Sequence, residues 1–172
     1  PRVPAPLTRA LGAVAEAVVR SWNRHLRDRH VEEVWERHTA ASVGVVSRTS
    51  AGYPTEAFEG ASWPPELLVH RGSLDLLAGA RVAIVGTRAC TEQGRQTAAR
   101  LGSDLAEAGV AVVSGLALGI DAAAHLGALR GGGAPVIGVV GSGLDVVYPA
   151  RNASLWRAVA AEGLLMSEHP LG

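Results

Sequence analysis

Two short apolar runs that each end at a glycine turn constrain the fold of this chain most strongly. The runs occupy residues 82–85 and 110–113, and they end at Gly86 and at Ser114-Gly115. The segment between them is long enough for one helix and carries apolar residues at helical spacing on one face. Two strands joined by such a crossover run parallel. Both glycine turns are therefore predicted at the same carboxyl edge of a sheet, where open α/β sheets bind ligands.

The same alternation continues to the end of the chain. Strand and helix segments follow one another with glycines at the expected helix ends, which predicts the α/β class and a doubly wound, mostly parallel sheet. The predicted strands are 82–86, 110–114, 135–140 and 164–167, with a further short strand at 67–70, and the predicted helices are 91–108, 119–130 and 152–162.

The region before this sheet has a different character. Residues 1–43 carry an apolar stripe at three- and four-residue spacing, which predicts a small helical region, and residues 44–65 are rich in Ser, Thr, Gly and Pro, as in a connection. We expect the α/β domain to occupy residues 66–172 and to be incomplete at its C-terminus. A basic cluster at residues 20–30 has two interpretations, a phosphate contact or a solvated helix face.

Charge and composition exclude several classes of function. The 16 basic and 16 acidic residues give a formal net charge of zero, so no global field attracts nucleic acid and any polyanion site must be local. Every basic residue is Arg, which excludes a Walker lysine and a Schiff-base lysine. The single cysteine, Cys90, allows neither an internal disulfide nor a cysteine metal cluster. No apolar run reaches the ~20 residues of a membrane span, so we expect no membrane partner. We expect a cytoplasmic protein and predict neither a metal nor a cofactor.

The first turn, Gly86-Thr87-Arg88, lacks the further glycines of the dinucleotide fingerprint GxGxxG. It instead places a guanidinium at the tip of an exposed turn, together with a hydroxyl and free backbone N–H groups, a combination that suits phosphate. A second interpretation is equally open, in which Arg88 pairs with a carboxylate such as Asp121 or Glu92.

The second turn runs from Ser114 to Asp121, and its glycines, Gly115 and Gly119, allow a tight backbone at the start of the next helix. The free N–H groups of that helix face the same edge and suit a phosphate without the help of a lysine. Asp121 also has a structural interpretation, as a residue that stabilises the helix N-terminus. His125 lies one helical turn later, but Ser114 is the only candidate nucleophile, and a structural hydrogen bond is the favoured use of its hydroxyl. We therefore expect no catalysis here.

The third turn, Gly141-Ser142-Gly143, follows the strand at 135–140, and the segment after it carries Tyr148 and a candidate N-cap, Asn152. Tyr148 either stacks on a base or covers the edge of the sheet. Three strand ends thus deliver glycine turns to one rim. The residues predicted to bind phosphate at this rim are Gly86, Thr87, Arg88, Ser114, Gly115, Gly119, Asp121, Gly141, Ser142, Gly143, Arg151 and Asn152.

Several motifs in a fixed order resemble those of the DprA/Smf family of DNA-processing proteins. They are IVGTR (84–88), SGLALGID (114–121), GSGLDVVYP (141–149) and SEHPLG (167–172), and the similarity covers about residues 44–172. The resemblance implies a Rossmann-like domain of a bacterial protein that binds single-stranded DNA and delivers it to a RecA-type recombinase during natural transformation or recombination, without catalysis. It implies a DNA-backbone contact for Arg88 and allows a homodimer in the full-length protein.

A second hypothesis is an enzyme, namely a nucleotide-binding protein or nucleoside-monophosphate phosphoribohydrolase of the related lysine-decarboxylase-like group, which has a similar sheet. The PGGxGT motif of that group does not occur in this sequence, and residues 131–135 (GGGAP) are only superficially similar to it. A third hypothesis, an interaction module that recruits a recombinase through the N-terminal helices, rests on no motif.

Overall fold

The computed structural model describes residues 31–172, which belong to two compact units, residues 1–40 and residues 41–172. From the first unit it describes helix α3 (Val31–Ala40), which has two acidic residues in its first turn and two basic residues in its last. The two carboxylates and the guanidinium of Arg37 complement the helix dipole. The part of the predicted apolar stripe within residues 1–30 and the basic cluster at residues 20–30 lie outside the described residues.

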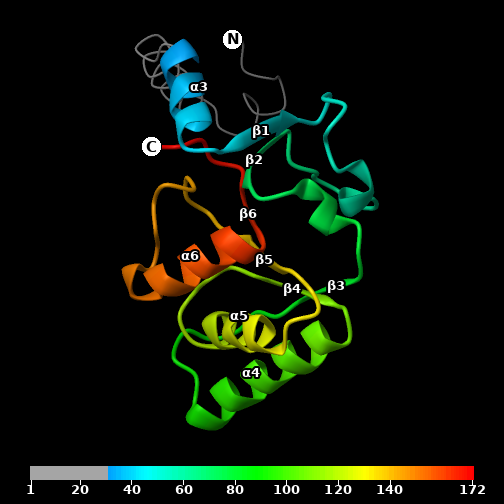
Figure 1. Cartoon of the computed structure of the whole chain (residues 1–172), viewed down its shortest axis with the longest axis vertical. Coiled ribbons are helices and arrows are strands. Elements are labelled where there is room, and N and C mark those ends of the chain that lie inside the picture. The colour runs from blue at the N-terminus through cyan, green and yellow to red at the C-terminus, as the bar shows by residue number, and fades with distance from the viewer. Residues whose placement is uncertain (1–30) are drawn as a thin grey trace, which may run out of the picture. The chain divides into compact units, whose positions relative to one another are not determined.

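A six-stranded sheet of mixed orientation forms the centre of the second unit. Its strands, from one edge to the other, are β1 (Gly44–Ser47), β2 (Leu67–Arg71), β6 (Leu164–Ser167), β5 (Val136–Val139), β4 (Ala111–Ser114) and β3 (Arg81–Ala83), as Figure 1 shows. The strands β3 to β6 run parallel, whereas β2 is antiparallel to both β6 and β1. The α/β class and the mostly parallel, Rossmann-like sheet predicted from the sequence are confirmed.

The segment 44–65, which the sequence predicts to be a connection, begins with an edge strand. β1 pairs with β2 from Gly44 opposite His70 to Ser47 opposite Leu67. Four residues are too few to show a clear alternation of apolar and polar positions, so the ladder is visible only once the partner strand is in place. The imidazole of His70 occupies the space that a Gly44 side chain would need, which explains the glycine at the start of β1.

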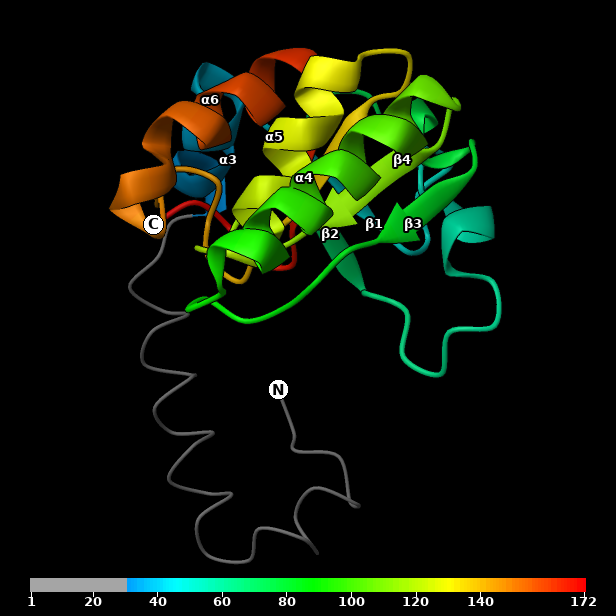
Figure 2. The same ribbon diagram turned by 90° about the horizontal axis from the view of Figure 1, so that it is seen from below.

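Three crossover helices, α4 (Glu92–Glu107), α5 (Ile120–Gly131) and α6 (Ala153–Glu162), lie together on one face of the sheet (Figure 2). The reason is topological: β3, β4, β5 and β6 are neighbours in chain order, and successive right-handed crossovers in one direction place every helix on the same side. Alternate strand residues face this layer, and Val112, Val136 and Leu165 join the core beneath it.

The opposite face of the sheet carries a smaller apolar cluster, covered by two 3-10 turns, η1 (Thr55–Phe58) and η2 (Leu74–Leu77). This cover does not reach the end of β5, where Val139 remains 43% exposed. Within residues 41–172 the helical layer is therefore one-sided rather than doubly wound as predicted, and short turns take its place on the other side. The buried members of the smaller cluster are Leu77, Ala111, Ile137, Leu164 and Met166.

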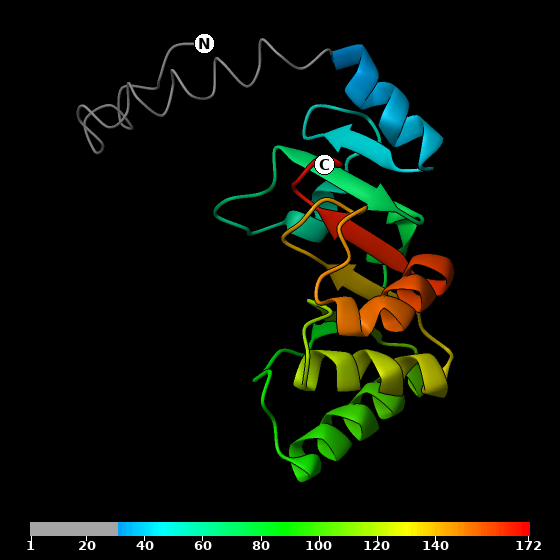
Figure 3. The ribbon, with the colours of Figure 1, turned by 90° about the vertical axis from the view of Figure 1, so that its left-hand side faces the viewer.

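Helices α4 and α5 pack side by side at very short range (Figures 2 and 3). Glycines make this possible: a Cβ at Gly102 would overlap with the carbonyl oxygen of Ala124, and a Cβ at Gly127 with that of Ala99. Backbone-to-backbone contact of this kind fixes α5 in position. The N-terminus of α5 consequently has a defined place at the carboxyl edge of the sheet.

Candidate functional site

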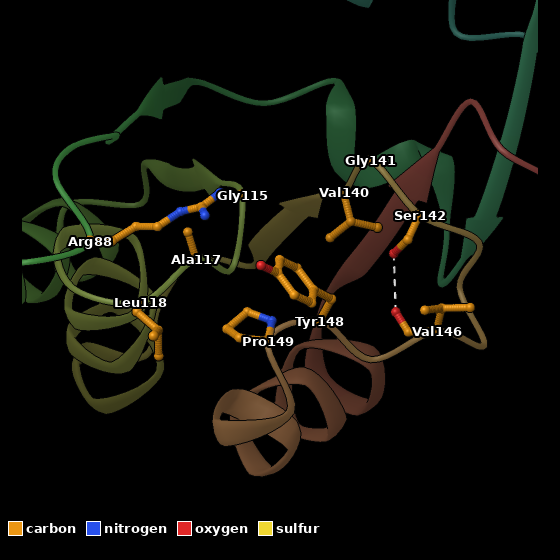
Figure 4. Close-up of a pocket in the computed structure, with 10 residues that line it drawn as sticks. All are labelled: Arg88, Gly115, Ala117, Leu118, Val140, Gly141, Ser142, Val146, Tyr148 and Pro149. Atoms are coloured by element: carbon orange, nitrogen blue, oxygen red, sulfur yellow. Dashed lines mark hydrogen bonds between the residues drawn. The ribbon is translucent and has the colours of Figure 1, made fainter.

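A cavity of about 430 Å³ lies at the carboxyl ends of β4 and β5, as Figure 4 shows. Residues of all three predicted glycine turns contribute to it. Among the described residues its wall contains a single guanidinium, and most of the remaining side chains are apolar. The lining residues are Arg88, Gly115, Ala117, Leu118, Val140, Gly141, Ser142, Val146, Tyr148 and Pro149.

Arg88 supplies the positive charge of this cavity. Figure 4 shows its side chain extending from the first turn toward Gly115. Within residues 31–172 its guanidinium forms no ion pair. The two carboxylates that the sequence offers as partners are engaged elsewhere, since Glu92 pairs with Arg95 at 3.1 Å and Asp121 binds backbone amides. The charge of Arg88 is therefore available to a ligand.

Asp121 joins the first turn to the second. It is 6% exposed, and its carboxylate accepts hydrogen bonds from the N–H of Gly86 at 3.2 Å and from the N–H of Gly115 at 3.1 Å. It also lies in the first turn of α5, where negative charge is favourable. Two of the amides that the sequence suggests for a phosphate thus bind the protein's own carboxylate, and Asp121 itself lies outside the cavity lining.

The start of α5 fits closely against the first turn. Gly119 has a φ of 82° and approaches the Thr87 backbone so closely that a Cβ would overlap with it. The N–H of Ile120 donates to the carbonyl of Thr87 at 3.3 Å, and a Cβ on Gly86 would collide with the Ile120 side chain. Thr87 uses its hydroxyl oxygen to accept from the N–H of Ala89 at 3.2 Å. Gly86 and Gly119 are therefore needed for this packing.

Ser114 and His125 point into the protein and form no catalytic pair in the cavity. Ser114 is 3% exposed and donates its hydroxyl hydrogen to the carbonyl of Ile84 at 2.5 Å. His125 is fully buried, and its Nε2 lies 3.1 Å from the carbonyl oxygen of Ile137. Burial lowers the pKa of His125 below its ordinary value of 6.5. The imidazole is consequently neutral and part of the core.

The third turn supplies the wall that faces Arg88. Ser142 donates its hydroxyl hydrogen to the carbonyl of Val146 at 3.0 Å, the dashed line in Figure 4, and this bond closes the loop between them. Tyr148 follows, 63% exposed, with its ring beside Pro149. An exposed aromatic ring in a cavity wall offers a surface on which a flat ligand stacks.

Three further residues of the predicted rim lie outside the lining. Asn152 occupies the N-cap position of α6 as predicted, but its side chain makes no cap bond. Its amide instead donates to the carbonyls of Leu116 at 2.8 Å and Ala117 at 3.1 Å and so holds the second turn. Gly143 packs closely against residues 170–171, and Arg151 is exposed on the 3-10 turn η3 (Ala150–Asn152).

Sequence reasoning places Arg88, Gly115, Gly141 and Ser142 at the site but misses most of its apolar wall. A search for phosphate donors passes over aliphatic side chains, and their only signal is their position within or beside the glycine turns. Residues 31–172 contain no group of three or more His, Cys, Asp or Glu side chains suited to a metal ion. No helix in that part of the chain is long and apolar enough to cross a membrane. The missed lining residues are Ala117, Leu118, Val140, Val146 and Pro149.

The fold and its motifs match one known family. The family model for DNA recombination-mediator protein A matches residues 44–172. This chain belongs to that family. Among curated proteins it is 40% identical to Protein Smf of Synechocystis sp. (strain ATCC 27184 / PCC 6803 / Kazusa) over 80% of this chain and 35% of that protein. It is 45% identical to DNA processing protein DprA of Streptococcus pneumoniae (strain ATCC BAA-255 / R6) over 63% of this chain and 38% of the relative. The resemblance to DprA/Smf proteins is confirmed.

Solved structures of family members share the fold. The X-ray structure of DprA from Streptococcus pneumoniae has a TM-score of 0.67 at 40% identity and covers 75% of this chain and 44% of its own. A structure of DNA processing protein A from Helicobacter pylori, described for its unique single-stranded DNA binding mode, has a TM-score of 0.63 at 32% identity, over 74% and 56% of the two chains. The chain spans about a third of the length of the curated relatives it matches.

Proposed function

We propose that the cavity at the carboxyl ends of β4 and β5 binds single-stranded DNA and that the chain serves DNA processing or recombination without catalysing a reaction. The observation that carries this proposal is the Arg88 guanidinium, which enters an otherwise largely apolar cavity and has no ion-pair partner among the described residues. The Helicobacter pylori relative supports it, since that protein binds single-stranded DNA.

The two kinds of group in the cavity match the two parts of a nucleotide. A guanidinium binds phosphate oxygens through paired, charge-assisted hydrogen bonds, and we assign this role to Arg88. An aromatic ring such as Tyr148 stacks on a base, which is accessible in a single strand and shielded in a duplex. The backbone of Gly115 and Gly141 and the hydroxyl of Ser142 line the space between these groups. The site thus favours an unpaired strand.

Partners of the whole protein follow from the same proposal. The family is described as a recombination mediator, which supports a RecA-type recombinase as the protein that receives the strand. A homodimer and a cytoplasmic location are further parts of the proposal. The recombinase partner is tested by pull-down of a recombinase with the full-length protein on single-stranded DNA. This part of the proposal is contradicted if the recombinase binds single-stranded DNA neither faster nor more tightly when the protein is present.

The DNA site is tested by Arg88→Ala, with Arg100→Ala as the matched control. Arg100 is exposed on α4, and its contact with Asp104 is long, at 3.8 Å. Fluorescence anisotropy with a labelled oligo-dT measures the affinity at several salt concentrations. We expect Arg88→Ala to weaken binding about 10- to 100-fold and to reduce the slope of log K against log salt by about 0.7, the value for one phosphate of a single strand. Arg100→Ala should bind as the unchanged chain does.

Two results contradict the proposal. In the first, Arg88→Ala binds oligo-dT as tightly as the unchanged chain at moderate salt. In the second, the chain releases free base from nucleoside monophosphates, which would assign it to the phosphoribohydrolase alternative.

A further inference from the structure

A second cavity of about 480 Å³ adjoins the first. It lies at the carboxyl ends of β5 and β6, on the face of the sheet that carries the smaller apolar cluster, because Met166 and Phe58 belong to both. The two cavities share Val140 and Gly141 as lining residues. The remaining residues that line the second cavity are Pro65, Leu68, Val139, Ser167, Glu168 and His169.

Among residues 31–172, the charge of the second cavity is opposite to that of the first. No Arg of this part of the chain lines it, and the one carboxylate in its described lining belongs to Glu168, which is exposed. Within residues 31–172 that carboxylate takes part in no hydrogen bond or ion pair. A carboxylate repels phosphate and accepts hydrogen bonds from amino groups. The apolar walls, with the ring of Phe58 among them, suit the flat face of a base.

The two cavities meet at Gly141, which lines both of them. Gly141 contributes no side chain there, and a Cβ built on it would have no neighbour within 4 Å. A strand can therefore continue from the cavity that contains Arg88 to the one that contains Glu168. Proteins that bind single strands commonly combine backbone contacts with a row of base-stacking surfaces.

We propose that the second cavity receives a base of the same strand whose phosphate Arg88 binds, and that Glu168 selects bases with an exocyclic amino group, cytosine above thymine. This inference rests on the proposed function. The occupant is a base because the cavity continues the proposed DNA site and presents an acceptor where a phosphate site would present a cation. Glu168 discriminates between bases, whereas Arg88 binds the phosphate of a strand of any sequence.

The test compares oligo-dC and oligo-dT of 12 nucleotides by fluorescence anisotropy on the 172-residue chain. We expect the unchanged chain to prefer oligo-dC about fivefold or more, since a carboxylate accepts from the cytosine N4 amino group. Glu168→Ala should remove this preference and leave the affinity for oligo-dT within about twofold. Glu162→Ala is the matched control, an exposed glutamate outside both cavities, and should retain the preference. Equal binding of both oligonucleotides by the unchanged chain overturns the proposal.

A second variant examines the stacking wall. Phe58→Leu keeps an apolar side chain against the smaller cluster but removes the ring, and we expect it to weaken binding of both oligonucleotides about tenfold while circular dichroism confirms the fold. If Arg88→Ala weakens binding but Phe58→Leu and Glu168→Ala behave as the unchanged chain, the second cavity has another occupant and this inference is wrong, whereas the proposed function stands. If Arg88→Ala has no effect, the proposed function fails as well.

Discussion

Replacing Asp121 tests whether a carboxylate outside the cavity holds the cavity together. In Asp121→Ala, the N–H groups of Gly86 and Gly115 lose an acceptor at 3.2 and 3.1 Å. The first turn carries Arg88, and the second turn carries part of the cavity wall. We therefore expect loss of both stability and DNA affinity, although Asp121 touches no ligand in the proposed site.

The size of the stability loss can be worked out from these two bonds. A hydrogen bond to a charged acceptor contributes about 1.5 to 3 kcal/mol to the free energy of unfolding. The lower value applies because Gly86 is exposed and its N–H can return to water. Two such bonds give about 3 kcal/mol. In a domain of this size that corresponds to a fall in the melting temperature of about 6–12 °C.

The asparagine variant makes the argument more specific. The side chain of Asp121→Asn has the same shape but only one oxygen acceptor, so its NH₂ group must face one of the two backbone N–H donors. We expect about half of the loss seen with alanine. Asp104→Ala is the control, because its exposed contact with Arg100 at 3.8 Å contributes little. Thermal melts and urea titrations followed by circular dichroism measure these differences. An Asp121→Asn variant as stable as the unchanged chain would refute the reasoning.

The remaining predictions concern packing, pH and the second turn. Gly127→Ala should lower the free energy of unfolding by about 2–3 kcal/mol in urea titration, because its Cβ would overlap with the carbonyl oxygen of Ala99. Gly79→Ala is the control, because a Cβ there would have no neighbour within 4 Å, and it should lower the free energy of unfolding by less than about 0.5 kcal/mol. Burial lowers the pKa of His125 below 6.5, so its contribution to stability is complete above pH 6.5 and is lost as the pH falls toward the lowered pKa. The free energy of unfolding should change with pH by up to about 1.4 kcal/mol per pH unit in this range. The same pH dependence in His125→Leu would contradict this. Asn152→Ala should reduce DNA affinity in the anisotropy assay, because it frees the two carbonyls that its amide binds in the second turn; unchanged affinity would show that the second turn holds its shape without it.

Most of the fold could be predicted from the sequence because it is encoded locally. The predicted helix 119–130 corresponds to Ile120–Gly131, and the strand 164–167 to Leu164–Ser167. Apolar runs and glycine stops are properties of neighbouring residues, so they can be read without a structure. Strand β1 escaped prediction because its ladder depends on β2, twenty residues away.

The candidate site was predicted less completely, for a physical reason of the same kind. The position of Arg88 at a strand end follows from the sequence, and so does its meeting with Gly141 at one edge of the sheet. The sequence does not show which backbone amides remain free to bind a ligand, since that depends on the position of the Asp121 carboxylate in the folded protein.

The sequence alone thus determined the α/β alternation, the family and the arginine at the first turn. Only the tertiary structure decided that the carboxylate of Asp121 accepts hydrogen bonds from the N–H groups of Gly86 and Gly115. Arg88 is left without a carboxylate partner among the described residues. Only the structure showed that two cavities of different charge share the edge at Gly141. Hydrogen bonds and cavity walls depend on distances between residues far apart in the chain, and those distances exist only after the sheet and its helices have packed.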